Sequence, residues 1–220
     1  MKPILEKHLT NIDCDIRIYQ PNAEIKEVLR AERVKLTPAR AMLLSMLYEL
    51  VRSGEFVSEF SAEKIAYFLQ RCGAKELFKL EFQPNFYGPY SGKVKHVLYY
   101  LNGSYIIGYS SKDKKPFEEI GILPDAEIDI INFFENKENE AYKAIVEKTK
   151  KLLKGFYSHF ALELLSTIDF IRSEKKVYSL ESITEELENW SDRKKTLFTN
   201  PKFIKIAIDT IQFHFPQEAV

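Results

Sequence analysis

The sequence predicts a mainly α-helical fold that carries a small β element of two or three strands. Apolar residues recur at helical spacing over most of residues 37–213, whereas apolar and polar residues alternate only at 78–82 and 105–109. The composition supports a self-sufficient core, because 45% of the 220 residues are hydrophobic and 29% are charged. We therefore expect a helical body in which the two alternating stretches pair as a β-ribbon.

Helix-start and helix-stop residues divide the first half of this body. Thr37-Pro38 places a capping hydroxyl before a first-turn proline, so a helix is expected from there to about residue 52, before Gly54. The same signals predict, in order, a helix from Ser61 to Gly73, a strand over 78–82, a helix over 92–101 opened by Ser91 and stopped at Asn102-Gly103, and a strand over 105–109.

Helical periodicity resumes after a loop at 110–124 and continues almost to the end of the chain. The expected helices are 125–136, 139–154, 158–173, 179–189 and 200–213. The expected caps are Asp125, Ser158, Ser179 and Thr199, and Pro201 stands where a first-turn proline belongs.

Residues 1–22 differ from the helical body. They predict a short helix and a strand, Asp15 to Tyr19, for which no partner strand is evident nearby. Because strand backbone groups need partners, this stretch is either the end of a domain whose body is missing or an edge strand of a small sheet. We expect a linker at 23–36 and the helical domain at 37–215.

The charge balance and the cysteines limit the classes of function. The 32 basic and 32 acidic residues cancel, which removes the simplest argument for a general nucleic-acid binder. Cys14 and Cys72 lie outside any metal-ligand spacing and indicate reduced thiols in a cytoplasm. No apolar run approaches the ~18 residues of a membrane span. We expect a cytoplasmic protein without cofactor or metal.

The turn Tyr87-Gly88-Pro89-Tyr90 is the most distinctive local feature. Gly88 can adopt a positive φ, and Pro89 disfavours the right-handed helical region for Gly88. The turn could hold an anion at the start of the following helix, where Lys93, Lys95 and His96 lie. It could instead fix the angle between strand 78–82 and helix 92–101, with its tyrosines in the core.

No arrangement of reactive side chains indicates catalysis. His96 could act as a base, but no local pattern places a serine or cysteine nucleophile beside it. The other histidines are equally isolated, and no two lie within one helical turn, so no linear metal motif is present.

Charge is unevenly distributed along the chain. Acidic residues predominate over 118–140 and 181–192, and lysines cluster over 148–154. These are either ordinary solvated helix faces or acidic surfaces that present Phe133, Phe134 and Trp190 to a basic partner. Trp190 with the basic residues 193–195 could alternatively contact nucleic acid.

Several motifs, in order over residues 36–213, resemble the C-terminal domain of DarG, the antitoxin of the DarT–DarG pair, and more broadly the Panacea antitoxin domains. The matching motifs are Leu36-Thr37-Pro38-Ala39-Arg40-Ala41, Lys64-Ile65-Ala66-Tyr67-Phe68-Leu69-Gln70, Tyr87-Gly88-Pro89-Tyr90, His96-Val97-Leu98, Gly103-Ser104-Tyr105-Ile106-Ile107-Gly108-Tyr109, and Trp190-Ser191-Asp192-Arg193-Lys194-Lys195 followed by Phe198-Thr199.

In that family, a macrodomain removes ADP-ribose from DNA, and the C-terminal domain binds a toxin that ADP-ribosylates single-stranded DNA. The resemblance implies that residues 1–22 are the end of a macrodomain, whose glycine-rich loops and catalytic lysine are absent here, so no enzymatic activity is expected. It implies an antitoxin that blocks the DNA groove of a DarT-type ADP-ribosyltransferase, with no membrane contact or direct nucleic-acid binding.

These observations give a set of candidate partner-binding residues and one alternative function. A nucleic-acid-binding module that uses the basic residues of 93–96 and 193–195 is the alternative function. The structural turn is assigned to Gly88, Pro89 and Gly103. The candidate partner-binding residues are Tyr87, Tyr90, Lys93, His96, Glu127, Asp129, Phe133, Phe134, Glu135 and Trp190.

Overall fold

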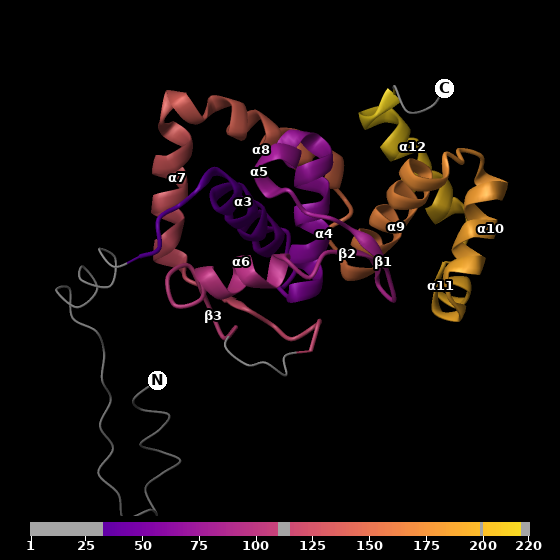
Figure 1. The fold of residues 1–220 in the computed structure, drawn as a ribbon, viewed down its shortest axis with the longest axis horizontal. Helices are drawn as coiled ribbons and strands as arrows, with labels where there is room; N and C mark the ends of the chain where they lie inside the picture. The colour runs from indigo at the N-terminus through magenta and orange to yellow at the C-terminus, as the bar shows by residue number, and fades with distance from the viewer. Residues whose placement is uncertain (1–32, 110–114, 199, 217–220) are drawn as a thin grey trace, which may run out of the picture. The chain divides into compact units, whose positions relative to one another are not determined.

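The computed structural model describes residues 33–109, 115–198 and 200–216 (Figure 1). The chain divides into two units, residues 1–33 and 34–220, and the description below concerns the second. The predicted helix and strand of residues 1–22 lie outside the described residues, as does residue 199 with the predicted Thr199 cap. The predicted domain division at 22 and 36 stays a prediction.

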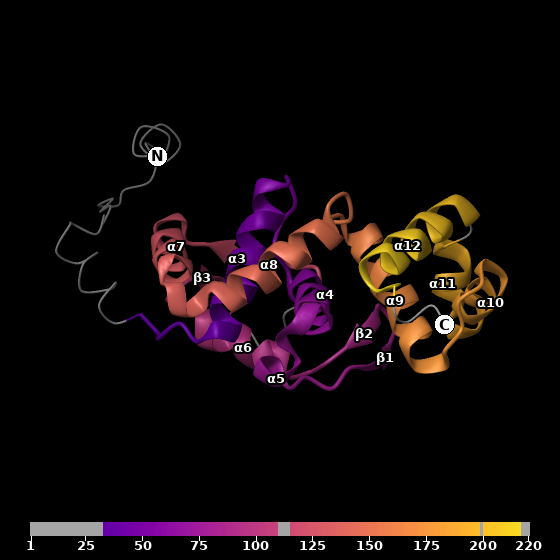
Figure 2. The ribbon, with the colours of Figure 1, turned by 90° about the horizontal axis from the view of Figure 1, so that it is seen from above.

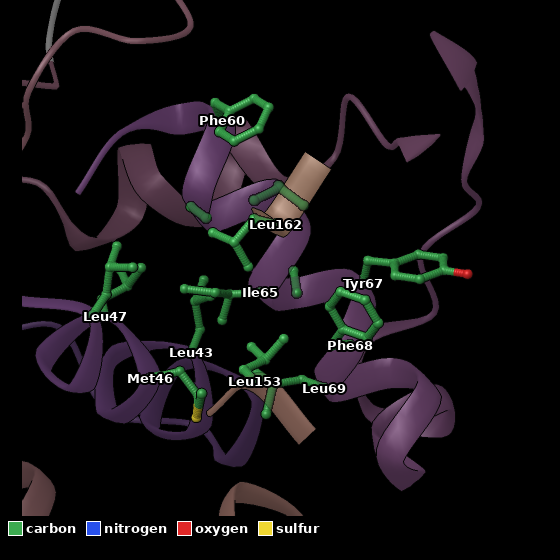
Figure 3. Close-up of a cluster of buried hydrophobic side chains, with 14 of the residues drawn as sticks. Leu43, Met46, Leu47, Phe60, Ile65, Tyr67, Phe68, Leu69, Leu153 and Leu162 are labelled. Atoms are coloured by element: carbon green, nitrogen blue, oxygen red, sulfur yellow. The ribbon is translucent and has the colours of Figure 1, made fainter. Parts of the chain in front are cut away.

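Among the described residues, the five longest helices before residue 155 form the first half of the second unit. They are α3 (Pro38–Arg52), α4 (Glu59–Leu69), α6 (Val94–Leu101), α7 (Glu127–Glu135) and α8 (Glu140–Leu153). Helix α3 packs against α4, α7 and α8, and α4 also contacts α6 (Figure 1). Leu43 of α3, Ile65 and Phe68 of α4 and Leu153 of α8 are fully buried where these helices meet (Figure 3).

Four helices form the second half: α9 (His159–Lys175), α10 (Leu180–Trp190), α11 (Asp192–Leu197) and α12 (Pro201–His214). Helix α9 is buried on all sides from Leu162 to Arg172, because it contacts α4 on one side and α10 and α12 on the others (Figure 2). A helix buried all round joins the two groups of helices. The mainly α-helical class predicted from the sequence is confirmed.

A buried ionic contact ties α9 to the first group. Asp169 of α9 accepts hydrogen bonds from the Tyr67 hydroxyl and from Arg71 Nε, both at 2.6 Å. Its carboxylate is fully buried, so the two donors compensate for its loss of hydration. Helices α4 and α9 are therefore held side by side, in the place where the candidate site lies.

The small β element is confirmed, but its first strand lies elsewhere than predicted. Strand β1 (Gln83–Asn85) pairs antiparallel with β2 (Gly88–Tyr90), and β3 (Ile106–Ile107) pairs antiparallel with β4 (Gly121–Ile122). The predicted strand 78–82 and its pairing with 105–109 are wrong. Residue 78 instead ends a short helix, α5 (Lys75–Phe78), which follows a π-helical turn, η1 (Gln70–Ala74).

Most of the predicted helix boundaries agree with the structure, but one predicted helix end and three predicted helix starts are wrong. Gly73 has a φ of 132° and kinks the helical path instead of ending it. Ser61 does not open α4, because Ser58 is the cap, and the two serines form a reciprocal capping box. Ser91 does not cap α6, and Asp125 does not cap α7.

The C-terminal helix starts agree better with the sequence. Ser158 and Ser179 cap α9 and α10 as predicted, and Asn200 caps α12 with Pro201 in its first turn. The six-residue helix α11, which Ser191 caps, was not predicted because it is too short for a periodic pattern. Within the described residues, no helix has the length and apolar character needed to cross a bilayer.

Candidate functional site

The Tyr-Gly-Pro-Tyr turn brings the β1–β2 hairpin directly against α9. Gly88 has a φ of 92°, and a Cβ atom there would lie 2.6 Å from Thr167 Oγ1. The conformation and the close approach therefore both require glycine. The turn does not set strand 78–82 against helix 92–101, as one interpretation of the sequence held, but joins the hairpin to α9.

A cavity of about 290 Å³ lies beside this turn. Helix α4 supplies two carboxyl groups, Glu59 and Glu63, which stand one helical turn apart and so share a face. The hairpin supplies aromatic and amide groups on the opposite side. The complete lining is Glu59, Phe60, Glu63, Lys64, Asn85, Tyr87, Gly88, Tyr90 and Pro116.

Glu63 has the chemistry of a proton donor. Its side chain is only 1% exposed, and Oε2 accepts a hydrogen bond from the Ser91 N–H at 3.0 Å. Among the described residues, its other oxygen, Oε1, is buried without a hydrogen-bond partner. Burial raises the pKa of Glu63 to about 8, and the nearby Glu59 acts in the same direction. Glu63 is therefore mainly a neutral carboxylic acid at pH 7.

Glu59 lies in a more polar environment than Glu63. The Tyr109 hydroxyl donates a hydrogen bond to Glu59 Oε2 at 2.5 Å, and the side chain is partly exposed. Burial raises the pKa of Tyr90, and the carboxyl groups of Glu59, to which Tyr90 also hydrogen-bonds, and Glu63 act in the same direction. Two carboxyl groups on one helix face, one dry and one hydrogen-bonded, can take opposite roles in proton transfer.

Lys64 holds the hairpin against α4. Its Nζ donates a 2.6 Å hydrogen bond to the Pro89 carbonyl, and the whole side chain is 1% exposed. Burial, with a smaller contribution from the positive charge of Lys194, lowers the pKa of Lys64 to about 7 against the opposing effect of Glu63. The amino group is therefore easily deprotonated near neutral pH while its position stays fixed.

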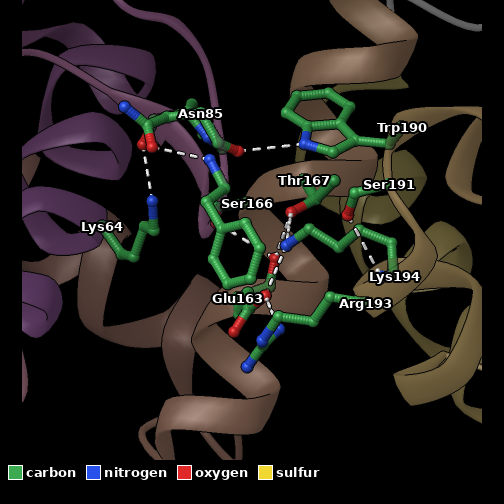
Figure 4. A network of polar contacts seen from close by, with 11 residues as sticks. Lys64, Asn85, Glu163, Ser166, Thr167, Trp190, Ser191, Arg193 and Lys194 are labelled. Carbon is green, nitrogen blue, oxygen red and sulfur yellow. Dashed lines mark hydrogen bonds and ion pairs between the residues drawn. The ribbon is translucent and has the colours of Figure 1, made fainter.

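A second polar cluster supports the hairpin from α9 and α11 (Figure 4). Glu163 Oε1 accepts hydrogen bonds from both Arg193 Nη1 and Lys194 Nζ. The Arg193 guanidinium also stacks on the Tyr87 ring, 5.1 Å from its centre. Lys194 is fully buried, so it cannot reach a phosphate, and the predicted use of residues 193–195 as a basic nucleic-acid surface is wrong for Lys194.

The candidate partner-binding residues fall in separate places. Tyr87 and Tyr90 line the cavity, and Trp190 Nε1 donates a 3.0 Å hydrogen bond to the Asn85 carbonyl at the hairpin. Lys93, the residue before α6, and His96 on α6 are exposed. The remaining residues lie on α7 and do not line the cavity: Glu127, Asp129, Phe133, Phe134 and Glu135. Their roles in binding a partner stay predictions.

Glu59, Glu63 and Lys64 were missed as site residues. The signal was present, because a Glu-x-x-x-Glu-Lys pattern inside a strongly apolar helix places charges where burial is expected. The described residues contain no group of three or more His, Cys, Asp or Glu side chains placed to hold a metal ion. What the cavity offers is paired carboxyl chemistry.

Comparison with known proteins gives a consistent description. No family model matches the chain. Over 203 residues the chain is 30% identical to a Thermus aquaticus protein named DNA ADP-ribosyl glycohydrolase, covering 90% of this chain and 53% of that protein. Proteins of the same name from Mycobacterium tuberculosis and Mycobacterium bovis are 22% identical over 211 residues, covering 90% of this chain and 59% of theirs. The chain spans about half the length of the curated relatives it matches.

These matches correct the expectations that came from the resemblance. The identification with a DarG-type C-terminal antitoxin domain, the antitoxin function and the absence of enzymatic activity are wrong. The relatives that match nine tenths of this chain are named as glycohydrolases, so the motifs quoted above do not single out a toxin-binding module.

Proposed function

We propose that this chain belongs to a protein that removes ADP-ribose from DNA by hydrolysing a glycosidic bond, and that the cavity at Glu63 takes part in that reaction. The names of the relatives support the reaction class. The observation that carries the assignment to this cavity is Glu63 itself, a buried carboxylic acid with a pKa of about 8 beside a second carboxyl group.

The two carboxyl groups suit acid–base hydrolysis. Their Cβ atoms are roughly 5–6 Å apart, as for any residues one helical turn apart. Glu63 would give its proton to the DNA atom that leaves, while Glu59 takes a proton from the attacking water. The bond between the anomeric carbon and DNA breaks, hydroxide from water joins that carbon, and proton exchange restores both carboxyl groups.

The rest of the cavity has a positioning role. Lys64 fixes the hairpin through the Pro89 carbonyl, so Tyr87 and Tyr90 keep their places opposite the carboxyl groups. The Arg193 guanidinium lies over the Tyr87 ring and helps to hold it in place. A ribose would meet aromatic faces and hydroxyl groups there, and these are the groups that commonly line small-molecule cavities.

The decisive substitution is Glu63→Gln. Glutamine keeps the shape and can still accept the Ser91 hydrogen bond, but it has no acidic proton. Release of ADP-ribose from an ADP-ribosylated oligonucleotide is measured with the 220-residue chain and its variant in parallel. We expect at least about a 100-fold lower rate, the lower end of the range for general acid catalysis.

A matched variant controls for the exchange of a glutamate for a glutamine elsewhere in the chain. Glu185→Gln removes an exposed carboxylate on α10, outside the cavity, and is expected to leave the rate unchanged. If the Glu63→Gln protein releases ADP-ribose as fast as the wild type, the cavity is not part of the reaction.

We also propose a cytoplasmic location. The support is the free, buried thiol of Cys72, which is typical of proteins kept in a reducing compartment.

A further inference from the structure

A second hollow, of about 890 Å³, lies where the β1 strand meets the ends of α9 and α10. It shares only Asn85 with the lining of the Glu63 cavity, so it is a separate site. Four of its twelve lining residues are aromatic. The rings come from Phe82, Phe86, Phe170 and Trp190, and the rim carries Glu81 and Glu174.

The aromatic walls are held in place before any ligand arrives. Trp190 donates its indole N–H to the Asn85 carbonyl at 3.0 Å (Figure 4), and its ring lies edge-on to Phe170 at 5.9 Å. Phe86 is 53% exposed, although exposure of so large an apolar ring is costly. A rigid aromatic wall beside an exposed ring is the usual form of a binding surface.

The charges at the rim decide what kind of ligand fits. Glu81 and Glu174 are exposed, and within the described part of the chain neither has an ion-pair partner. The lysine in the lining, Lys175, is paired with Glu186. Arg193, whose guanidinium lies 5.7 Å from the centre of the Phe86 ring, is paired with Glu163. The two unpaired carboxylates therefore leave the rim negative, which repels phosphates and attracts cations.

We propose that this hollow binds a basic protein segment, with an arginine side chain stacked on the rings of Phe86 and Trp190 and paired with the rim carboxylates. A guanidinium combines a planar face, which stacks on aromatic rings, with a fork of donors that matches a carboxylate. A nucleic-acid strand also stacks on aromatic rings, but it would bring its phosphates toward Glu81 and Glu174. This site is independent of the proposed hydrolysis.

Trp190 is the only tryptophan in the chain, so its fluorescence reports on this hollow alone. The probe is an acetylated Gly-Arg-Gly-Arg-Gly amide, and the matched probe carries citrulline, which has the same shape without the charge. We expect a saturable change in emission with the arginine peptide, weakened by added salt, and no saturation with the citrulline peptide.

Two sets of variants test the contacts. Glu81→Gln with Glu174→Gln, and separately Phe86→Ala, should each raise the Kd for the arginine peptide at least fivefold. Glu181→Gln with Glu185→Gln removes the same charge from exposed positions on α10 outside the hollow and should leave the Kd unchanged. All these side chains are exposed, so the variants should fold, and circular dichroism checks this.

Three results would overturn the proposal. The first is no saturation at millimolar arginine peptide, and the second is equal binding of the citrulline peptide. The third is saturable binding of oligothymidine that survives the loss of Glu81 and Glu174, which would assign the hollow to nucleobases.

Discussion

At the scale of single residues, the candidate site depends on charges placed where water is excluded. Glu63 and Lys64 are neighbours in sequence and each is 1% exposed, yet their polar atoms have different surroundings. Lys64 Nζ donates a hydrogen bond to the Pro89 carbonyl, whereas Glu63 Oε1 has no hydrogen-bond partner among the described residues. An unsatisfied buried oxygen is costly, which is why it indicates a function.

The raised pKa of Glu63 predicts a pH dependence of stability. Between pH 4.5 and about pH 8, Glu63 is protonated in the folded chain but has lost its proton in the unfolded chain. This contribution to stability is therefore complete below pH 4.5 and is lost as the pH rises to about 8. From pH 5 to pH 7 the wild type should lose about 2 kcal/mol of unfolding free energy relative to Glu63→Gln.

Urea unfolding at the two pH values measures this difference. Lys64 has a pKa of about 7 in the folded chain, where the charge of Glu63 raises it, and of 10.5 in the unfolded chain. It is therefore mainly charged in both states from pH 5 to about pH 6, and the comparison of the two proteins is cleanest in that part of the range. Parallel curves for the wild type and the variant would mean that Glu63 titrates normally.

Gly88 tests the close approach of the hairpin to α9. Alanine at this position must adopt a φ of 92° and place its Cβ 2.6 Å from Thr167 Oγ1. We expect Gly88→Ala to lower the unfolding free energy by about 3 kcal/mol, from backbone strain and overpacking together. Gly103→Ala is the control. Gly103 has a φ of 85°, but an added Cβ atom would meet nothing within 4 Å, so this substitution should lower the unfolding free energy by only about 1 kcal/mol. Equal costs in a thermal or urea denaturation experiment would contradict the account.

At the scale of elements, the sequence predicted helices well and strands poorly. Helix α3 begins at Pro38 and ends at Arg52, close to the expected bounds, because cap, proline and glycine signals are local. Alternation of apolar residues at 78–82 suggested a strand, but the hairpin forms at 83–90, where Gly88 meets α9. That contact joins residues far apart in sequence, so no local pattern could reveal it.

The cap of α4 gives a prediction at this scale. Ser58 Oγ accepts a hydrogen bond from the Ser61 N–H at 3.2 Å, so Ser58→Ala should cost about 1 kcal/mol of unfolding free energy. Thr37 also occupies a helix N-cap but makes no side-chain capping bond, and Thr37→Ala should cost clearly less. Thermal denaturation of the two variants compares them, and equal losses would show that the capping box does not stabilise α4.

At the scale of the whole molecule, the candidate site is built from distant parts of the chain. Helix α4 contributes the carboxyl groups, the hairpin contributes the tyrosines, and α9 with α11 supplies the Glu163 cluster that supports them. The sequence singled out the turn and Trp190 but not Glu59 or Glu63, because the expected helix start at Ser61 left Glu59 outside the helix and hid the pairing of the two acids on one face. The motifs likewise predicted an antitoxin function, which the relatives named as glycohydrolases contradict.

The central claim is that Glu63 is a neutral acid in a cavity that meets ADP-ribose. Carbon-13 NMR of glutamate side-chain carboxyl groups, titrated over pH with and without ADP-ribose, tests it directly, and Glu63→Gln assigns the signal. We expect a Glu63 midpoint near pH 8 that moves when ADP-ribose is added. A midpoint near 4.5 that ADP-ribose leaves unchanged would contradict the claim.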